Sequence, residues 1–367
     1  MLEKIYVHNF RCFQNFELVL TDVSSALLLG KNGVGKSSLI AAIEVLQQIG
    51  RGVTQVKELI HEADFGFGSK DSGIAMEITA RLHGRAFVYS LEIEFPETFV
   101  QPKVRREALA VDGKTVMQRE GGDTVLNNAA HFTLDWHHVG LPIISVRSEE
   151  EPIAVFRRWL RNIIVLSPCP SRFAEVATLE TADLERHGET ILDWAHGILS
   201  DNPSLYSHVS GFLKERMTDF EVFKFETVGR EKELWFTFSG EDRTQLRLNF
   251  SQLSDGEKIF FVAGVLLSAL HGDLPLVCLW DEPDHYISLP ELSHFMTSCR
   301  RAFENDRNHS QLIITSHNER VLNEFSDHNT FILSRARHTY PTRVAVLADK
   351  EFVSPRVVDA YENGELD

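Results

Sequence analysis

Apolar and polar residues alternate over many short stretches of this chain. The stretches with this period are residues 4–10, 16–20, 75–82, 86–95, 106–111, 115–119, 220–225, 234–238 and 246–250. Strict alternation is typical of half-buried β-strands, and Asp112-Gly113-Lys114 favours a tight turn between two of them. The pattern predicts β-hairpins and an antiparallel β-rich lobe over residues 75–120.

Other stretches have helical spacing or are apolar throughout. Helical spacing occurs in residues 38–46, 153–160, 255–267 and 174–217, the last with breaks at Gly188 and at Asn202-Pro203. Apolar runs that end in polar residues occur at 24–29, 162–166, 276–280 and 311–315. Such runs are typical of buried parallel strands. The chain is therefore predicted to be an α/β protein with a mixed β-sheet core.

The first apolar run leads into Gly30-Lys31-Asn32-Gly33-Val34-Gly35-Lys36-Ser37, which fits the pattern G-x-x-x-x-G-K-S. Glycines allow the backbone to turn so that its N–H groups and the next helix N-terminus point at phosphates. In this pattern Lys36 reaches the β and γ phosphates and Ser37 ligates Mg²⁺. The residues expected to bind the nucleotide here are Gly30, Asn32, Gly33, Gly35, Lys36, Ser37 and Ser38.

Three further polar side chains follow apolar runs. Asp281 and Glu282 come directly after residues 276–280, and His317 follows residues 311–315. We expect Asp281 to hold Mg²⁺ and Glu282 to act as general base on the attacking water. His317 can donate a hydrogen bond to a γ-phosphate. Because ligands bind at the carboxyl ends of strands in such sheets, we expect these groups to meet at one site.

Leu253-Ser254-Asp255-Gly256-Glu257-Lys258 precedes the helical pattern of residues 255–267. Ser254 or Asp255 can cap this helix. Gly256 would let an anion approach the first backbone N–H groups. The hexapeptide is therefore a second candidate phosphate contact.

Composition narrows the possible partners. Acidic residues outnumber basic ones by 53 to 37, which gives a formal net charge of −16 and argues against indiscriminate nucleic-acid binding. The most concentrated basic group is Arg157, Arg158, Arg161 and Arg172, either a solvated surface or a DNA or partner contact. Four widely spaced cysteines, the absence of a signal-like start and the absence of a membrane-length apolar run favour a cytoplasmic protein.

GKNGVGKS, LSDGEK, LWDEP and TSHN, in this order, resemble the Walker A loop, signature motif, Walker B motif and switch histidine of ABC-type ATPases. The opening VHNFRCF and the form LSDGEK are closer to the RecF, SMC and OLD branch, which includes compact bacterial ATPases associated with phage defence. The resemblance implies a single Mg²⁺-dependent ATPase head over residues 1–367. Its expected parts are a nucleotide-binding core (1–50 and 221–345), the β-rich lobe (75–120) and a helical insertion (121–220).

The resemblance also implies a homodimer that sandwiches ATP. Ser254 and Gly256 of one subunit would contact ATP held by the Walker A loop of the other, and Glu282 and His317 would complete the site. Transporter-type heads place a glutamine beside Mg²⁺, whereas this chain has no glutamine between Gln118 and Gln245. Either Ser167 substitutes for it or the contact is missing.

The leading functional hypothesis is that the protein is an ATPase head in antiphage defence. It would regulate a partner effector protein or act as the sensor for it. The absence of heptads excludes a long SMC-type coiled coil, and the segment after His317 is too short for a nuclease domain. We therefore expect any nuclease or toxin to be a separate protein. The alternatives are a RecF-like DNA-binding repair ATPase and an ATP-binding scaffold with little turnover.

Overall fold

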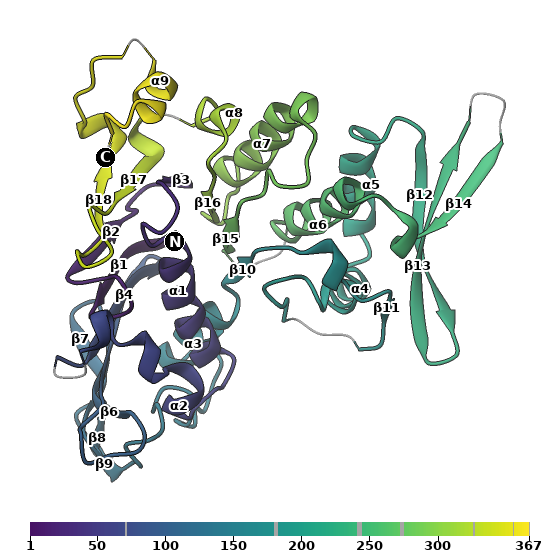
Figure 1. The fold of residues 1–367 in the computed structure, drawn as a ribbon. Helices are drawn as coiled ribbons and strands as arrows, with labels where there is room; N and C mark the ends of the chain where they lie inside the picture. Colours follow the sequence, from purple (N-terminus) through teal and green to yellow (C-terminus); the bar gives the residue numbers. More distant parts are fainter. Residues whose placement is uncertain are drawn as a thin grey trace. The chain divides into compact units, whose positions relative to one another are not determined.

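The computed structural model describes residues 1–69, 72–179, 183–240, 244–271, 275–325, 327–354 and 356–366. The chain divides into two compact units (Figure 1). Unit 1 comprises Met1–Ile163 and Phe325–Asp367, and unit 2 comprises Ile164–Glu324. Each unit is described by itself below.

Unit 1 contains an eight-stranded antiparallel sheet. Its strands, in order across the sheet, are β2 (Phe16–Val19), β1 (Leu2–His8), β4 (Ile74–Leu82), β5 (Arg85–Glu94), β6 (Lys103–Val111), β7 (Lys114–Glu120), β8 (Asp123–Leu126) and β9 (Ala130–Thr133). The sheet confirms the hairpins predicted from residues 4 to 119. Strands β8 and β9 were not predicted, because each has four residues and β9 is exposed along its whole length.

A second set of strands in unit 1 carries the Walker A segment. Strand β3 (Ser25–Leu29) is buried at all five positions and pairs in parallel with β17 (Thr330–Ser334). Strand β17 pairs in turn with the antiparallel strand β18 (Arg343–Val346). The helices of unit 1 are α1 (Lys36–Gly50), α2 (Val56–Leu59), α3 (Pro152–Arg161) and α9 (Val357–Glu362).

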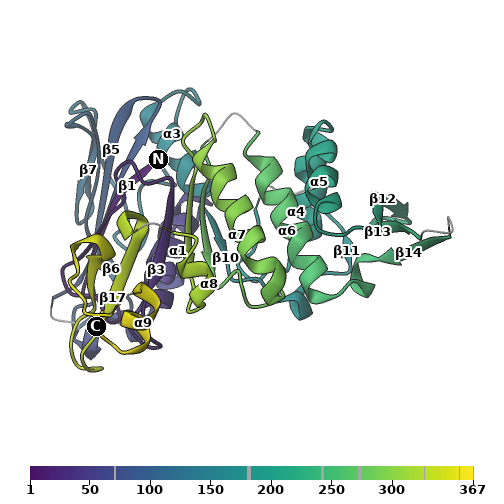
Figure 2. The ribbon, with the colours of Figure 1, turned by 90° about the horizontal axis from the view of Figure 1, so that it is seen from above.

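Helices α1 and α3 pack closely against each other; they lie next to each other in Figure 1, and Figure 2 shows both from above. A Cβ atom at Gly50, the last residue of α1, would lie 2.4 Å from the backbone nitrogen of Arg161. The side-chain amide of Gln47 donates a hydrogen bond to the carbonyl of Ile163. The end of α1 is therefore fixed by backbone-level contact with α3.

A fully buried ion pair lies within the eight-stranded sheet. A guanidinium nitrogen of Arg119 on β7 is 3.7 Å from the carboxylate of Glu107 on β6, and both side chains are 0% exposed. The same carboxylate accepts hydrogen bonds from the Tyr89 hydroxyl and from the backbone N–H groups of Gly140 and Leu141. Burial raises the pKa of Glu107, against the opposing effect of these donors.

Arg119 also donates to three backbone carbonyls, those of Gly121, Asp135 and His138. The network therefore fastens the irregular segment around residues 135–141 to the sheet, because a buried polar group requires hydrogen-bond partners.

Unit 2 is built on three parallel strands, in which β15 (Val277–Asp281) pairs with β10 (Ile164–Leu166) and with β16 (Gln311–Thr315). Its helices are α4 (Ile191–Asp201), α5 (Leu205–Lys214), α6 (Asp255–Ala269), α7 (Leu289–Glu304) and α8 (Glu319–Leu322). Strand β10 confirms the buried strand predicted at residues 162–166, and it pairs with β15 although it falls in the segment 121–220 that was expected to be a helical insertion.

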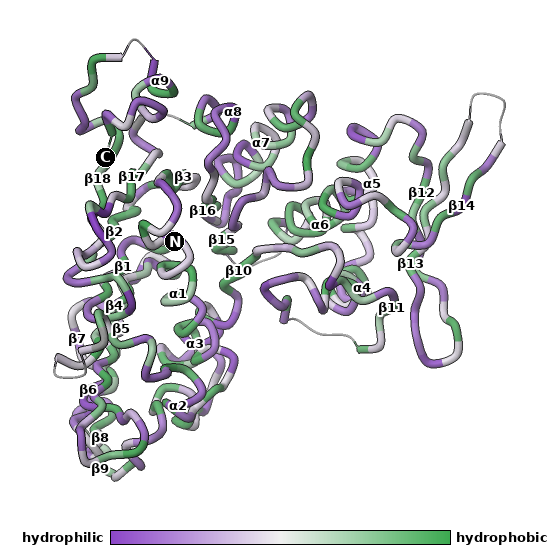
Figure 3. The backbone as a smooth tube through the Cα atoms, viewed as in Figure 1, coloured by the Kyte–Doolittle hydropathy of each residue, from purple (hydrophilic) through white to green (hydrophobic). Residues whose placement is uncertain are grey.

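A small antiparallel sheet completes unit 2. Strand β13 (Glu231–Ser239) pairs with β12 (Phe220–Val228), β14 (Gln245–Asn249) and β11 (Val176–Ala177). Helix α6 is hydrophobic along most of its length (Figure 3) and is buried from Ile259 to Ser268. Its Phe261 ring contacts the rings of Phe223, Phe236 and Phe250, which joins α6 to the small sheet.

The helical prediction for residues 174–217 is wrong at its start. Residues 176–177 form strand β11, and helix begins only at Ile191, while residues 180–182 lie outside the described part of the chain. The carboxylate of Asp193 accepts hydrogen bonds from the backbone N–H groups of Thr178 and Leu179, which satisfies these donors without a helix. The predicted breaks are confirmed, since Gly188 has φ of 86° and α4 ends before Asn202.

Across the described residues, no helix has both the length and the apolar character needed to cross a lipid bilayer.

Candidate active site

The Walker A segment forms a glycine-dependent loop in unit 1. Gly33 and Gly35 have φ angles of 79° and 112°, which side-chain-bearing residues rarely adopt. A Cβ atom at Gly35 would also lie 2.7 Å from the Cys12 sulfur and 2.9 Å from the Thr342 hydroxyl. Gly35 precedes α1 without providing a side-chain cap, and the first turn of α1 has no acidic residue. The backbone N–H groups at the start of α1 are therefore suited to binding an anion.

The two side chains expected to contact phosphate and Mg²⁺ differ in exposure. Lys36 is 8% exposed, and its ammonium group donates to the carbonyls of Gly30 and Lys31. Ser37, one residue further along α1, is exposed. These positions fit the expected roles, since Lys36 stays within the loop and the Ser37 hydroxyl is accessible.

The segment 334–343 supports the loop from the side, which sequence reasoning did not foresee. The Thr342 hydroxyl donates to the Val34 carbonyl at 2.6 Å, and Arg335 donates to the Gly33 carbonyl at 3.4 Å. Between this segment and the loop lies a pocket of about 700 Å³. Its basic lining residues are Lys31, Arg335, Arg337 and Arg343. A positively charged lining attracts phosphate groups.

In unit 2, strand register brings the second group of predicted residues together. Leu166 of β10 pairs with Trp280 of β15, and Asp281 pairs with Thr315 of β16. Parallel strands in register end at the same edge, so the residues that follow them become neighbours. Ser167 and His317 are such residues.

Asp281 is held by hydroxyl groups from both neighbouring strands. Its Oδ1 accepts a hydrogen bond from the Thr315 hydroxyl at 2.6 Å, and its Oδ2 accepts one from the Ser167 hydroxyl at 3.4 Å. The Asp281 side chain is 14% exposed. Carboxylate and hydroxyl oxygens are the ligands that Mg²⁺ prefers, so this group fits a magnesium site.

Glu282 lies between two histidines. One carboxylate oxygen is 2.9 Å from Nε2 of His285, and the other is 3.4 Å from Nε2 of His317. The backbone N–H of Glu282 donates to Thr315, and Glu282 has a left-handed φ of 49°. This turn directs Asp281 and Glu282 to different partners. The structure thus brings Asp281, Glu282 and His317 together, as the sequence predicted.

Sequence reasoning missed Thr315 and His285. Thr315 is the last residue of a buried strand, and only the register with β15 reveals that it faces Asp281. His285 follows Glu282 by three residues in the stretch Asp281-Glu282-Pro283-Asp284-His285, a spacing that could have indicated the contact.

The signature segment caps α6. The Ser254 hydroxyl and backbone N–H both lie 2.7 Å from one carboxylate oxygen of Glu257, and the backbone N–H of Glu257 faces the Ser254 hydroxyl at 3.4 Å. A Cβ atom at Gly256 would lie 3.0 Å from the Tyr286 carbonyl, so a side chain there would be crowded. This reciprocal arrangement is a capping box, which explains the choice of Ser254 and Glu257 locally.

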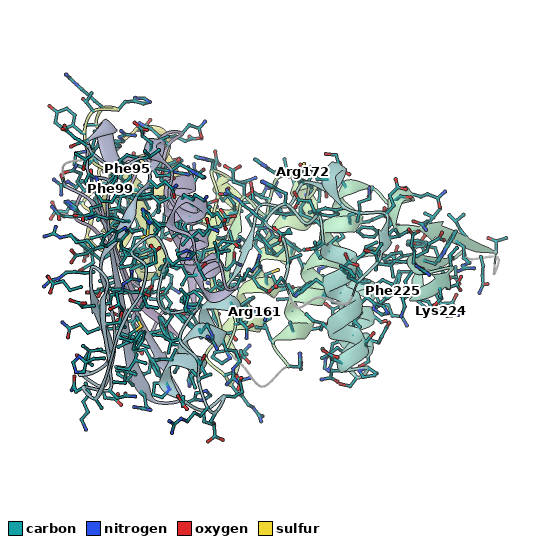
Figure 4. All side chains as sticks on the ribbon, turned by 90° about the horizontal axis from the view of Figure 1, so that it is seen from below. Phe95, Phe99, Arg161, Arg172, Lys224 and Phe225 are labelled. Carbon is teal, nitrogen blue, oxygen red and sulfur yellow. The ribbon has the colours of Figure 1, made fainter. Side chains whose placement is uncertain are left out.

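The basic group is divided between the two units. Arg157, Arg158 and Arg161 belong to unit 1 and Arg172 to unit 2; Figure 4 labels Arg161 and Arg172. Arg157 donates to the carbonyls of Pro142 and Ile144, Arg158 pairs with Glu149 at 3.7 Å, and Arg172 pairs with Glu189. The ion pairs of Arg158 and Arg172 reduce the charge that these two arginines could offer to DNA.

Comparison with known proteins identifies the family. Residues 126–323 match the sequence profile described as "AAA domain, putative AbiEii toxin, Type IV TA system". The chain belongs to this AAA-domain family. Residues 1–102 match a second profile, described as "AAA ATPase domain". No curated protein sequence matches the chain.

Solved structures show the same fold as this AAA-domain protein. An SMC head bound to the C-terminal winged-helix domain of ScpA is 14% identical, with a TM-score of 0.61, and the match covers 94% of this chain and 97% of that one. An Smc head with an extended coiled coil from Pyrococcus furiosus, bound to the C-terminal domain of ScpA, is 12% identical, with a TM-score of 0.58 and coverage of 99% and 98%.

These findings confirm the predicted ATPase-head fold, which the chain shares with SMC heads. The AAA-domain protein is an ATP-binding ATPase.

The four cysteines of the protein differ in their expected reactivity. Cys12, Cys278 and Cys299 are at most 5% exposed, whereas Cys169 is partly exposed. Burial raises the pKa of Cys299 to about 12 and that of Cys278 well above its usual value. Because the thiolate is the reactive form, we expect Ellman's reagent to modify about one thiol per native chain.

The variant Cys169→Ser is expected to abolish that reaction, while urea should expose the three remaining thiols. Rapid modification of two or more thiols in the native protein would contradict the observed burial.

Proposed function

We propose that this ATPase head binds Mg²⁺·ATP through the Walker A loop together with Asp281, Glu282 and His317. The observation that carries the proposal is the cluster at the ends of β15 and β16, where Glu282 lies between two histidines and beside Asp281. A carboxylate in that position can accept a proton from water, and a neighbouring imidazole can orient the water or the phosphate. An ATP-binding scaffold would not need this arrangement.

Each group of residues has a distinct role in the proposal. Gly33, Gly35 and Lys36 would hold the phosphates, and Ser37 and Asp281 would hold the metal. A bound Mg²⁺ would neutralise phosphate charge as the γ-phosphoryl group leaves. Asn32 and Ser38 would add contacts from the loop and the start of α1.

The active form would be a homodimer with ATP between the subunits. Ser254 and Gly256 of one subunit would contact the γ-phosphate bound by the Walker A loop of the other. The exposure of Ser254 and Asp255 supports this proposal, because the capping box engages the Ser254 and Glu257 N–H groups and leaves those of Asp255 and Gly256 to a ligand at the start of α6. ATP would then stabilise the dimer by mass action.

We further propose that the dimer controls a separate effector protein in bacterial antiphage defence. The family description mentions a putative toxin of a toxin–antitoxin system, and two similar SMC heads were solved with a bound partner protein. A reversible, ATP-dependent dimer is a suitable switch for such a partner, because its population depends on the nucleotide state.

Complementation between two inactive variants tests the shared site. Lys36→Ala removes phosphate binding, and Ser254→Arg blocks the signature contact, so each variant alone should lose ATPase activity. In a 1:1 mixture, half of the dimers are mixed and each has one intact site, so about a quarter of wild-type activity should return. Phosphate release measured on the mixture gives the answer.

Ser204→Arg, a matched change at the exposed start of α5, should retain full activity alone. If the mixture of Lys36→Ala and Ser254→Arg stays inactive while both variants are folded, the sites are not shared between subunits and the sandwich proposal is rejected.

A further inference from the structure

A cationic side chain lies beside the aspartate that we assign to the metal. A terminal guanidinium nitrogen of Arg186 is 3.7 Å from Oδ2 of Asp281, the same oxygen that faces the Ser167 hydroxyl. The two charged side chains are 23% and 14% exposed, so water screens their interaction only weakly. Because arginine stays protonated at any working pH, this positive charge is permanent.

Backbone hydrogen bonds place Arg186 there independently of the ion pair. The N–H of Ser167 donates to the Arg186 carbonyl at 2.8 Å, and the N–H of Cys169 donates to the His187 carbonyl at 3.0 Å. The segment that carries Arg186 therefore runs beside the segment that follows β10. Since the register of β10 and β15 fixes Ser167 next to Asp281, it also brings Arg186 to Asp281.

The turn that holds Arg186 is itself constrained. The N–H of Gly188 donates to the Glu185 carbonyl at 2.9 Å, and the N–H of Ile191 donates to the Gly188 carbonyl at 3.1 Å, where α4 begins. Gly188 has φ of 86°, and a Cβ atom there would lie 2.3 Å from the Phe173 ring. Arg186 thus projects from a fixed turn rather than from a long adaptable loop.

We infer that Arg186 is a positioning residue that competes with the divalent cation for Asp281 and so sets the metal requirement of the ATPase. The inference rests on the proposed function, in which Asp281 holds the metal. A dication and a guanidinium on the same carboxylate oxygen repel each other, so metal entry must displace Arg186. A metal ion without nucleotide would bind poorly, because Arg186 repels it. A metal ion that arrives with nucleotide is also attracted by the negative charge of the phosphates.

Transporter-type heads place a glutamine beside Mg²⁺, and this chain has none between Gln118 and Gln245. Arg186 cannot replace that glutamine. A glutamine carbonyl can ligate a cation, but a guanidinium group has only donors and carries a positive charge. Ser167 can supply an oxygen at this strand end, while Arg186 opposes the metal. The two residues therefore act on Asp281 in opposite ways.

Binding of Mn²⁺ to the protein with a non-hydrolysable ATP analogue tests the inference, with free Mn²⁺ measured by electron paramagnetic resonance. Arg186→Gln should tighten Mn²⁺ binding by roughly three- to tenfold, because the competing charge is gone. Arg186→Lys, which keeps the charge, should stay closer to wild type. Arg172→Gln removes a comparable ion pair, with Glu189, and should leave Mn²⁺ affinity unchanged.

Unchanged or weaker Mn²⁺ binding by Arg186→Gln would overturn the inference, provided that its circular dichroism spectrum is native. Asp281→Asn separates this failure from a failure of the proposed function. If Asp281→Asn weakens Mn²⁺ binding and Arg186→Gln has no effect, only the role of Arg186 is rejected. If Asp281→Asn has no effect either, the metal does not bind at Asp281 and both proposals are rejected.

Discussion

Replacing Glu282 with glutamine is expected to slow ATP hydrolysis by about 10²- to 10⁴-fold, the usual contribution of a positioned general base. Glutamine keeps the size of the side chain but cannot accept a proton from water. The backbone of Glu282 should stay in place, because its N–H donates to Thr315 on the neighbouring strand. We therefore expect a loss in kcat with ATP affinity within about threefold of wild type.

Two measurements separate the chemical step from binding. Single-turnover hydrolysis gives the rate of the chemical step, and calorimetry gives the affinity for ATP.

The same variant tests dimer formation. Because the slowed variant retains its nucleotide, size-exclusion chromatography with light scattering should show more dimer in ATP and Mg²⁺ than for wild type. A Glu282→Gln variant that remains monomeric under these conditions argues against the sandwich.

Glu291→Gln is the matched control, because Glu291 is an exposed glutamate in the first turn of α7. This variant should hydrolyse ATP at the wild-type rate. Undiminished hydrolysis by Glu282→Gln would remove Glu282 from the mechanism and favour the scaffold alternative.

Truncation of Arg119 to alanine is expected to lower the free energy of unfolding by about 3–5 kcal/mol, the cost of breaking a buried ion pair. The change leaves the Glu107 carboxylate buried without its cation and removes the donors to three backbone carbonyls. Both effects destabilise the eight-stranded sheet of unit 1, because unsatisfied buried polar groups are costly.

The variant Arg106→Ala, on the neighbouring strand β6, is the control for an exposed ion pair. Arg106 pairs with Glu120 at 3.5 Å, but these side chains are 54% and 71% exposed. The loss of an exposed pair should cost less than about 1 kcal/mol. Urea unfolding followed by circular dichroism measures both variants, and equal, small effects would show that the buried network contributes little.

Local features of the chain made much of the fold predictable. The Walker A loop depends on glycines that directly precede helix α1, and Asp112-Gly113 forms its turn between adjacent strands. Such features act between near neighbours, so the sequence displays them directly. Strands β8 and β9 escaped prediction because four residues are too few to display an alternating pattern, and β9 is also exposed along its whole length.

The sequence by itself determined the fold class and the four ordered motifs, and it pointed to Asp281, Glu282 and His317, because each motif consists of residues close together in the chain. Only the tertiary structure decided which side chains reach the Walker B carboxylates. Ser167, Arg186 and Thr315 come to Asp281 from distant parts of the sequence, through the register of β10, β15 and β16. Strand register results from the packing of whole strands, so no short segment encodes it.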